Sequence, residues 1–292
     1  MDTRIWNREP PYICSINTHP RPPRTAFKTI MLLMKEKVCV MKVGGAVVED
    51  TAALERFLAR FTAIDGKKVL VHGGGRLATN VASRIGIKTT MVQGRRITDG
   101  ATLRVVTMVY GGLVNKGIVA KLQSAGVNAI GLSGADMNII TSKRRPVRDG
   151  IDYGFVGDVT RVDGDALARL LMSGITPVIA PLTHDGAGTM LNTNADTIAS
   201  EVAQALAKTY DVTLTYCFEK AGVLGDPHDN SSVIPVITRD DLTRRIADGS
   251  INGGMIPKME NALAAMRGGV NRVIITSADS PDGTGGTEIH ND

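Results

Sequence analysis

Apolar residues along the chain recur with two different periods, and these periods alternate. Residues 37–43 (KVCVMKV) and 69–71 (VLV) are short valine-rich runs, which predicts two buried strands. Between them, residues 51–63 carry leucine and phenylalanine at three- and four-residue spacing, which predicts a helix with one apolar face. The beginning of this region is therefore expected to form a strand–helix–strand unit.

The same alternation continues through the rest of the chain. Further helices are expected at 101–124, 164–172, 195–208, 238–248 and 256–267, further strands at 129–132, 177–180, 212–217 and 273–276, and a charged hairpin-like region at 139–160. Strands that alternate with helices build a mostly parallel sheet with helices on both faces. We therefore expect an α/β fold whose ligands bind beyond the carboxyl ends of the strands.

Composition narrows the class of protein. A chain of 292 residues with 43% hydrophobic residues can bury a full core. No apolar run approaches the ~20 residues of a membrane-spanning helix, and the three cysteines contain no Cys-x-x-Cys pair that would indicate a zinc site. We expect a cytoplasmic protein with no membrane partner.

Residues 1–36 differ from the remainder of the chain. They contain prolines at positions 10, 11, 20, 22 and 23 and show no hydrophobic period, so we interpret them as an N-terminal arm that could be mobile. Their six Lys/Arg against three Asp/Glu account for +3 of the net charge of +5. The charge left for the other residues is too small to indicate a nucleic-acid surface, and we expect no nucleic-acid partner.

Three consecutive glycines follow the second strand, in LVHGGG at 70–75. Gly73–Ala78 satisfies the dinucleotide fingerprint Gly-x-Gly-x-x-Gly/Ala, so a nicotinamide dehydrogenase is one interpretation. That class expects an acidic residue about 20 positions later, where this chain has Arg95 and Arg96, which could instead hold an NADP phosphate. The fingerprint leaves the other glycine and lysine motifs unexplained.

Phosphoryl transfer accounts for more of these motifs, because it needs cations and backbone N–H groups aimed at the moving phosphoryl group. Lys42 precedes Gly44 and Gly45 at a strand end, and Lys258 follows a glycine pair in a first helical turn. Asp196 opens a helix and could hold both ammonium groups. No P-loop and no metal-ligand cluster is present, so Mg²⁺ would arrive with the nucleotide. The absence of an obvious general base favours a carboxylate acceptor, which is already an anion.

Eight motifs give the chain a specific resemblance to a known family. They are MKVGGAV at 41–47, LVHGGG at 70–75, GRRITD at 94–99, GLSGADMNIITSKR at 131–144, GFVGDVTRVD at 154–163, ITPVIAPL at 175–182, LNTNADTIA at 191–199 and GGMIPKMENAL at 253–263. With these motifs, residues 37–276 resemble the amino acid kinase family, and within it the N-acetylglutamate kinases.

The resemblance implies an open αβα sandwich that usually assembles as a homodimer. It implies a lobe at 37–208 that binds the acyl amino acid and a lobe at 209–292 that binds ATP, which would carry Mg²⁺. The implied reaction is phosphorylation of the side-chain carboxylate of an N-acyl-L-glutamate in arginine biosynthesis. Acetyl and succinyl are both open as the acyl group.

The family's functional positions can be matched one by one. Lys42 and Lys258 match its two transition-state lysines, and Asp196 matches the aspartate that organises them. Substrate-binding positions match Gly74, Gly75, Arg96 and Asn192, and the phosphate loop matches Gly44 and Gly45. Nucleotide-binding positions correspond to Glu219, Gly222, Val223, Leu224, Ser250, Ile251 and Asn252.

Arg95 departs from the family pattern, because a leucine or similar residue commonly precedes the substrate-binding arginine. An extra guanidinium could bind an extra carboxylate, so we hypothesise an N-succinyl acceptor. The alternative is that Arg95 points away from the pocket, since neighbouring strand residues face opposite sides. Glu219-Lys220 also departs from the family's usual aspartate followed by a small or apolar residue. Residues after Thr276 lack the helix of arginine-inhibited members, so we expect a dimer that arginine does not inhibit.

Other interpretations of these residues stay open at this stage. Within the fold, the acceptor could be carbamate, glutamate, aspartate or a nucleotide monophosphate, because shared phosphate machinery says little about the acceptor. A catalytically silent amino-acid sensor is a further alternative, although it would need a lost lysine. Individually, Asp196 could merely cap its helix, and the basic stretch 143–148 could be a solvated hairpin.

Overall fold

Eight strands form the central sheet of the part of the chain that is described, in the order β12–β14–β13–β11–β1–β2–β8–β5. The structure is a computed structural model that describes residues 35–92, 95–226, 228–251 and 255–290. Residues from Glu36 onward form one compact unit. The expected N-terminal arm at 1–36 lies outside the described residues up to position 34.

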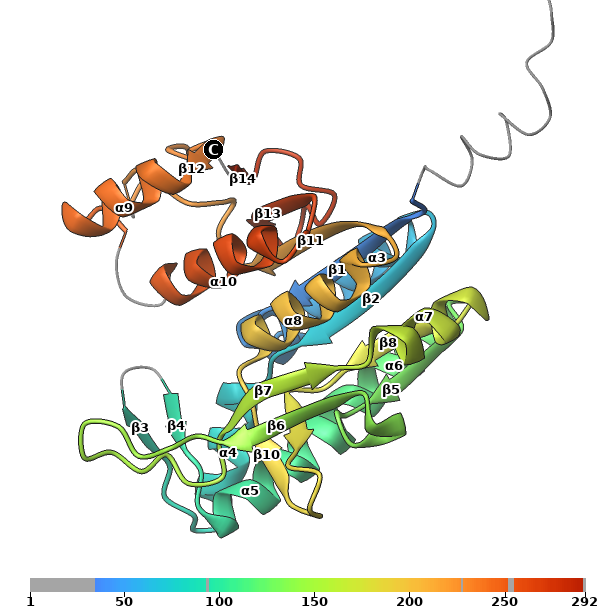
Figure 1. The fold of residues 1–292 in the computed structure, drawn as a ribbon, viewed down its shortest axis with the longest axis vertical. Helices are drawn as coiled ribbons and strands as arrows, with labels where there is room; N and C mark the ends of the chain where they lie inside the picture. The colour runs from blue at the N-terminus through green and yellow to red at the C-terminus, as the bar shows by residue number, and fades with distance from the viewer. Residues whose placement is uncertain (1–34, 93–94, 227, 252–254, 291–292) are drawn as a thin grey trace, which may run out of the picture. The chain divides into compact units, whose positions relative to one another are not determined.

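The sheet is mostly parallel, as expected, because only the β13–β14 pair within it is antiparallel. Figure 1 labels these strands and colours them by their position in the chain. Their bounds are β1 Lys37–Val43, β2 Lys67–His72, β5 Ala129–Leu132, β8 Thr176–Ile179, β11 Asp211–Phe218, β12 Val236–Thr238, β13 Arg272–Ser277 and β14 Thr287–His290. Each strand predicted from the sequence is present within two residues at each end. The strands β12, at one edge of the sheet, and β14, its neighbour, were not predicted.

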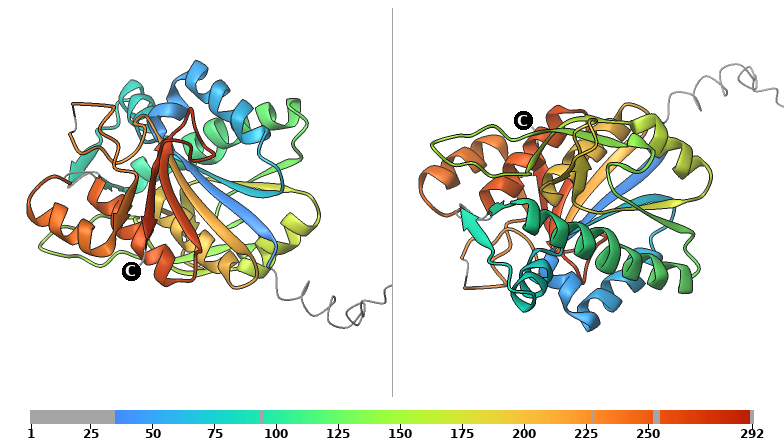
Figure 2. Two further views of the ribbon diagram at one scale, coloured as in Figure 1. Left: turned by 90° about the horizontal axis from the view of Figure 1, so that it is seen from above. Right: turned by 90° about the horizontal axis from the view of Figure 1, so that it is seen from below.

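Helices cover both faces of this sheet, and Figure 2 shows the strands between them. On one face lie α2 Gly45–Glu49, α3 Thr51–Thr62, α4 Gly75–Arg84, α5 Gly100–Val106 and α6 Asn115–Ser124, and on the other α7 Gly164–Met172, α8 Ala195–Ala207, α9 Arg239–Ala247 and α10 Met255–Arg267. Two hydrophobic clusters, one on each face, make the core. The expected αβα sandwich is confirmed.

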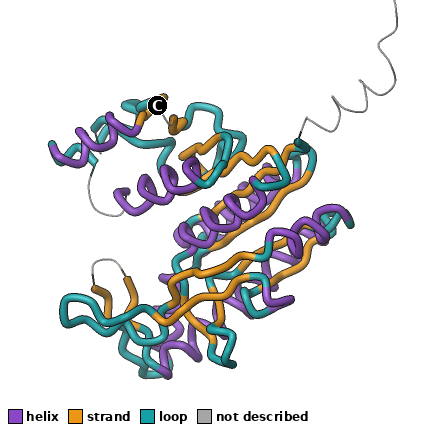
Figure 3. The backbone as a smooth tube through the Cα atoms, in the orientation of Figure 1, coloured by secondary structure: helices purple, strands orange, loops and turns teal. Residues whose placement is uncertain are grey.

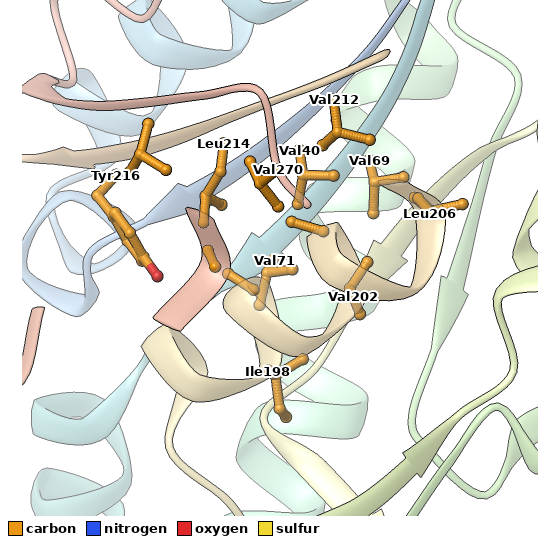
Figure 4. Packing of buried hydrophobic residues seen from close by; sticks show 14 of the residues in the cluster. Val40, Val69, Val71, Ile198, Val202, Leu206, Val212, Leu214, Tyr216 and Val270 are labelled. Carbon is orange, nitrogen blue, oxygen red and sulfur yellow. The ribbon is translucent and has the colours of Figure 1, made fainter. Parts of the chain in front are cut away.

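The period-two pattern of β1 decides which side chains reach which face. Val38 and Val40 pack in the cluster beneath α8, whereas Met41 and Val43 pack in the cluster on the opposite face. Figure 4 shows Val40 among valines of neighbouring strands and apolar residues of α8. Because side chains two residues apart share a face, Lys42 is directed to the α8 side at the carboxyl end of the strand.

The long helix expected at 101–124 is continuous but changes its winding. Between α5 and α6, residues Thr107–Val114 form a π-helical segment, η1. The run Gly100–Ser124 is long and apolar enough to cross a bilayer by length and composition. Its buried side chains, including Val106, Val109 and Ile118, lie in the hydrophobic cluster shared with the sheet.

Two smaller sheets lie outside the central sheet. A four-stranded sheet has the order β10–β9–β6–β7, with β6 Ile140–Arg144, β7 Gly157–Val162, β9 Leu182–His184 and β10 Met190–Asn192. This sheet is mixed, with β6 and β9 parallel and its other pairs antiparallel. A ribbon of β3 Thr90–Val92 and β4 Arg95–Ile97 lies apart from it. Figure 3 shows the long loop that joins β6 to β7. Isolated bridges join Thr98 to Gly154 and Val156 to Asn192, which brings this loop to β4 and β10.

Candidate active site

Two lysines from different elements share one carboxylate. Lys42 Nζ, from the end of β1, lies 2.7 Å from Asp196 Oδ1, and Lys258 Nζ, from the first turn of α10, lies 2.7 Å from Asp196 Oδ2. The second contact is also a hydrogen bond donated by Lys258. The predicted catalytic residues therefore come together in space, although their catalytic roles stay a prediction.

Burial and charge act in opposite directions on this trio. Burial by itself disfavours ionisation of Asp196, but the ammonium groups of Lys42 and Lys258 outweigh it and lower the pKa of Asp196 to about 2. Burial also lowers the pKa of Lys42, and the charge of Asp196 opposes this change. Asp196 is thus an anion at neutral pH, and one negative charge holds two positive charges in place.

Helix capping, the alternative role for Asp196, is performed by Asn194. The side chain of Asn194 accepts hydrogen bonds from the backbone N–H groups of Asp196, at 2.8 Å, and Thr197, at 3.1 Å. This satisfies two of the N–H groups that a helix start leaves without partners. The interpretation of Asp196 as a helix cap is therefore wrong, and its carboxylate is used for the two lysines instead.

The two glycine loops contact each other through their backbones. A Cβ on Gly73 would lie 2.8 Å from the nitrogen of Gly45, and a Cβ on Gly45 would lie 3.1 Å from the nitrogen of Gly74. Gly74 also has φ of 150°, a conformation that side chains disfavour. The backbone N–H of Gly44 already donates to the carbonyl of Cys217 at 2.9 Å. Within the predicted phosphate loop, Gly45 at the start of α2 is therefore better placed than Gly44 to donate a backbone N–H to a phosphate.

His72 supports the glycine loop from beneath. Its ring is fully buried; Nδ1 lies 2.8 Å from the carbonyl oxygen of Gly73 and Nε2 lies 3.1 Å from Nδ2 of Asn115. These partners fit a neutral ring that donates from Nδ1 and accepts at Nε2. Burial lowers the pKa of His72 to about 4, against the opposing effect of the Gly73 carbonyl.

A hollow beside the glycines collects the predicted substrate-binding residues. We name it the acceptor pocket, and it is lined by Gly73, Gly74, Gly75, Met91, Arg95, Arg96, Tyr110, Arg145, Val156, Pro181, Asn192, Thr193, Asn194 and Ala195. The structure thus brings together Gly74, Gly75, Arg96 and Asn192, which lie far apart in the sequence. The lining of the acceptor pocket also includes Asn194 and Ala195, which directly precede Asp196 in the chain.

Arg96 and Asn192 are held in the acceptor pocket by neighbours. Arg96 is buried, and its guanidinium donates to the carbonyl of Gly75 at 2.7 Å and to Thr79 Oγ1 at 2.8 Å. Asn192 Nδ2 donates to Thr98 Oγ1 at 3.0 Å. Both side chains are therefore oriented before any ligand binds.

Arg95 also lines the acceptor pocket, so the interpretation that it points away is wrong. Strand neighbours do alternate faces, but Arg95 lies in a two-stranded ribbon. Such ribbons twist strongly, and long side chains from both faces can reach one hollow.

Two further pocket residues were not identified from the sequence. Arg145 belongs to the stretch 143–148, which could have been a solvated hairpin. That interpretation is wrong for Arg145, because its side chain is largely buried and forms an ion pair with Asp158 at 2.5 Å. Tyr110 projects from the π-helical segment η1 into the pocket. A π-helical turn often marks a functional site, but the period of the sequence did not reveal it.

A second hollow collects most of the predicted nucleotide-binding residues. It is lined by Lys220, Gly222, Val223, Leu224, Ser250, Ile251 and Met255, and we name it the nucleotide pocket. Its aliphatic side chains suit the flat apolar faces of a purine base. Glu219 is not among the lining residues, whereas its neighbour Lys220 is; Asn252 lies outside the described residues. Met255 starts α10, so Lys258 lies one helical turn from this pocket.

The described residues contain no group of three or more His, Cys, Asp or Glu side chains that could hold an ion. The charged side chains that line the two pockets are Arg95, Arg96 and Arg145 in the acceptor pocket and Lys220 in the nucleotide pocket.

Comparison with known proteins identifies the family of this chain. Residues 37–277 match the model of the amino acid kinase family. A Phocaeicola vulgatus protein named acetylglutamate kinase is 61% identical over 256 residues, which cover 88% of this chain and 99% of that protein. A Bacteroides fragilis protein of the same name is also 61% identical over 256 residues, covering 88% of this chain and 98% of that protein.

A solved structure has a similar fold. The protein smu.665 from Streptococcus mutans UA159 superposes with a TM-score of 0.74 at 29% identity and covers 87% of this chain and 99% of its own. The family model spans most of the chain, and the two named relatives align along nearly their whole lengths. This chain therefore belongs to the amino acid kinase family and, within it, to the acetylglutamate kinases.

Proposed function

We propose that this protein transfers the γ-phosphoryl group of ATP to the side-chain carboxylate of an N-acyl-L-glutamate, in arginine biosynthesis. The products are an acyl phosphate and ADP. The observation that carries the proposal is the trio of Lys42, Asp196 and Lys258. Asp196 directly follows a residue that lines the acceptor pocket, and Lys258 lies one helical turn after a residue that lines the nucleotide pocket. The high identity to acetylglutamate kinases supports the same reaction.

The trio suits the charge that develops during transfer. As the bond from the γ-phosphorus to the bridging oxygen of ADP breaks and a bond to the acceptor oxygen forms, negative charge spreads over the phosphoryl oxygens. Lys42 and Lys258 offer two ammonium groups to that charge. Because Asp196 fixes both groups in advance, little reorganisation is needed during the reaction.

The acceptor needs no general base. A glutamate side-chain carboxylate has an ordinary pKa of ~4 and is already ionised at neutral pH. In our proposal, Arg96 and Asn192 bind the acyl amino acid, and the N–H groups at the starts of α2 and α4 bind phosphoryl oxygens. Helix N-termini carry partial positive charge that suits these anions.

ATP would bind at the nucleotide pocket, with the adenine against Val223, Leu224 and Ile251. Mg²⁺ bound to the ATP phosphates would neutralise part of their charge. This assignment divides the protein into an acceptor lobe at 37–208 and a nucleotide lobe at 209–292.

A direct test of the reaction class is to trap the acyl phosphate as a hydroxamate while measuring ADP release. The panel should contain N-acetyl- and N-succinyl-L-glutamate together with glutamate, aspartate and carbamate. Hydroxamate formed in step with ADP from an N-acylglutamate supports the proposal. Activity confined to a free amino acid or carbamate overturns it.

We further propose a cytoplasmic homodimer. An apolar hollow next to α5 is lined by residues that include Ile85, Ile87, Leu103, Met108 and Met190. Ile85 and Met108 are 56% and 58% exposed, which is unusual for large apolar side chains in a cluster. A second copy of the chain covering this hollow would remove that surface from water.

A further inference from the structure

The acceptor pocket contains more cationic groups than N-acetylglutamate needs. Three arginines, Arg95, Arg96 and Arg145, line it, and none of its lining residues is an aspartate or glutamate. N-acetylglutamate has two carboxylates, and one of them must reach the phosphoryl group near Lys42 and Lys258. Only its α-carboxylate is left for the three guanidinium groups.

The three arginines differ in how many hydrogen bonds and ion pairs their guanidinium groups form with neighbouring residues. Arg96 donates to a backbone carbonyl and to threonine hydroxyls. Arg145 forms two hydrogen bonds to Asp158, at 2.9 and 2.5 Å, and its guanidinium lies 5.5 Å from the ring centre of Tyr153. The backbone of Arg95 pairs with Val92 in the β3–β4 ribbon, but its guanidinium has no hydrogen bond or ion pair to any residue in the described ranges.

Arg95 and Arg145 also act on each other. Burial lowers the pKa of Arg95 and the charge of Arg145 lowers it further, whereas Tyr153, Asp158 and Glu260 oppose this change. Two guanidinium groups that repel each other in a half-buried hollow are stabilised by an anion placed between them. Asp158 is hydrogen-bonded to Arg145, and Asp158 and Glu260 favour the charged form of Arg95 without touching it. Arg95 is therefore the guanidinium that lacks a carboxylate in direct contact.

The remaining part of the ligand is its acyl group, and an acetyl methyl offers nothing to a guanidinium. A dicarboxylic acyl group would present a third carboxylate to Arg95, and Arg can bind a carboxylate through two parallel N–H groups. We propose that Arg95, assisted by Arg145, forms a subsite for a carboxylate at the end of the acyl group. The preferred acceptor would then be N-succinyl-L-glutamate or a close analogue.

This inference rests on the proposed kinase activity, and one experiment separates the two. It measures kcat/KM for phosphorylation of N-acetyl-L-glutamate, N-succinyl-L-glutamate and the N-succinamyl analogue, in which an amide replaces the terminal carboxylate. The succinamyl compound has the same length as the succinyl compound and lacks its charge. We expect about a tenfold or larger preference for the succinyl compound over both others, the scale of one charge-assisted contact.

Substitutions then assign the preference to a residue. Arg95→Gln should lower the succinyl-to-acetyl ratio of kcat/KM by about tenfold to a hundredfold, chiefly through a higher KM for the succinyl compound. Arg95→Lys keeps a charge and should retain part of the ratio. Arg84→Gln, on the exposed end of α4, is the matched control and should leave the ratio unchanged.

Each possible outcome rejects a different claim: the kinase activity, the carboxylate subsite or the role of Arg95. If no N-acylglutamate is phosphorylated, the proposed function is wrong. If the acetyl compound is used as well as or better than the succinyl compound, the kinase proposal stands and the subsite is wrong. A succinyl preference that survives Arg95→Gln likewise overturns the role of Arg95. Equal rates with the succinyl and succinamyl compounds would assign the preference to length and reject a carboxylate subsite.

Discussion

Lys258 and Asp196 are joined by a 2.7 Å hydrogen bond between the first turns of two helices, α10 and α8. The same carboxylate holds Lys42 at 2.7 Å through its other oxygen. The first turns of two helices and the end of one strand therefore converge on a single anion, and the positions of the two ammonium groups depend on it.

Lys258→Met should reduce kcat by about a hundredfold to a thousandfold, because the interaction of its charge grows in the transition state. The KM for the acyl acceptor should change much less. Steady-state kinetics with Lys88→Met as an exposed control tests this. An unchanged kcat would remove Lys258 from catalysis.

Asp196→Asn should impair both activity and folding. Two ammonium groups would then face each other in a buried site without an anion, and breaking such a buried pair costs about 3–5 kcal/mol. Denaturant unfolding and kcat should be measured together, with Asp240→Asn as the exposed control. Wild-type values of both quantities would contradict the geometry described for the trio.

The pKa of Asp196 also makes a pH prediction. Its folded value of about 2 is below the ordinary value, so its ionised form contributes stability above about pH 4, and that contribution is lost as pH falls through 2. Between about pH 5 and 9 Asp196 should not titrate. The test is the dependence of kcat on pH. If kcat fell on the acid side of that range in the wild type and this fall disappeared in Asp196→Asn, the prediction would be wrong.

His72 should make the fold sensitive to mild acid. Its pKa of about 4 lies below the ordinary value of 6.5, so the unfolded chain binds the proton more readily than the folded one. Stability contributed by the neutral ring is full above about pH 6.5 and declines as pH falls toward 4, by about 3 kcal/mol in total. Urea unfolding across this range should show a shallower pH slope for His72→Gln than for wild type; equal slopes would contradict the prediction.

Met108→Asp should convert the proposed dimer into a monomer, because it places a charge in an apolar hollow that a second copy would cover. Light scattering coupled to size exclusion measures the mass directly. Met172, which is 66% exposed at the end of α7, provides the matched control as Met172→Asp. A monomeric wild type would reject this interface.

Local pattern was sufficient for the main elements. The valine spacing in 37–43 determined β1 and the face on which Lys42 lies, and the leucine and phenylalanine spacing in 51–63 determined α3. These patterns are readable because each depends on residues only a few positions apart. The glycine loops were also readable, since glycines directly after a strand mark close backbone approach.

Contacts between distant segments were decided only by the tertiary structure. Arg145 belongs to a charged run that resembles any solvated hairpin, and it enters the acceptor pocket because β7 brings Asp158 beside it. The same holds for Tyr110, which a π-helical turn directs toward Gly74. By itself, the sequence of this protein determined six strands of its central sheet, most of its long helices, and the positions of its glycine loops and lysines. Which charges share a pocket depended on packing among elements far apart in the chain, a property that no local period records.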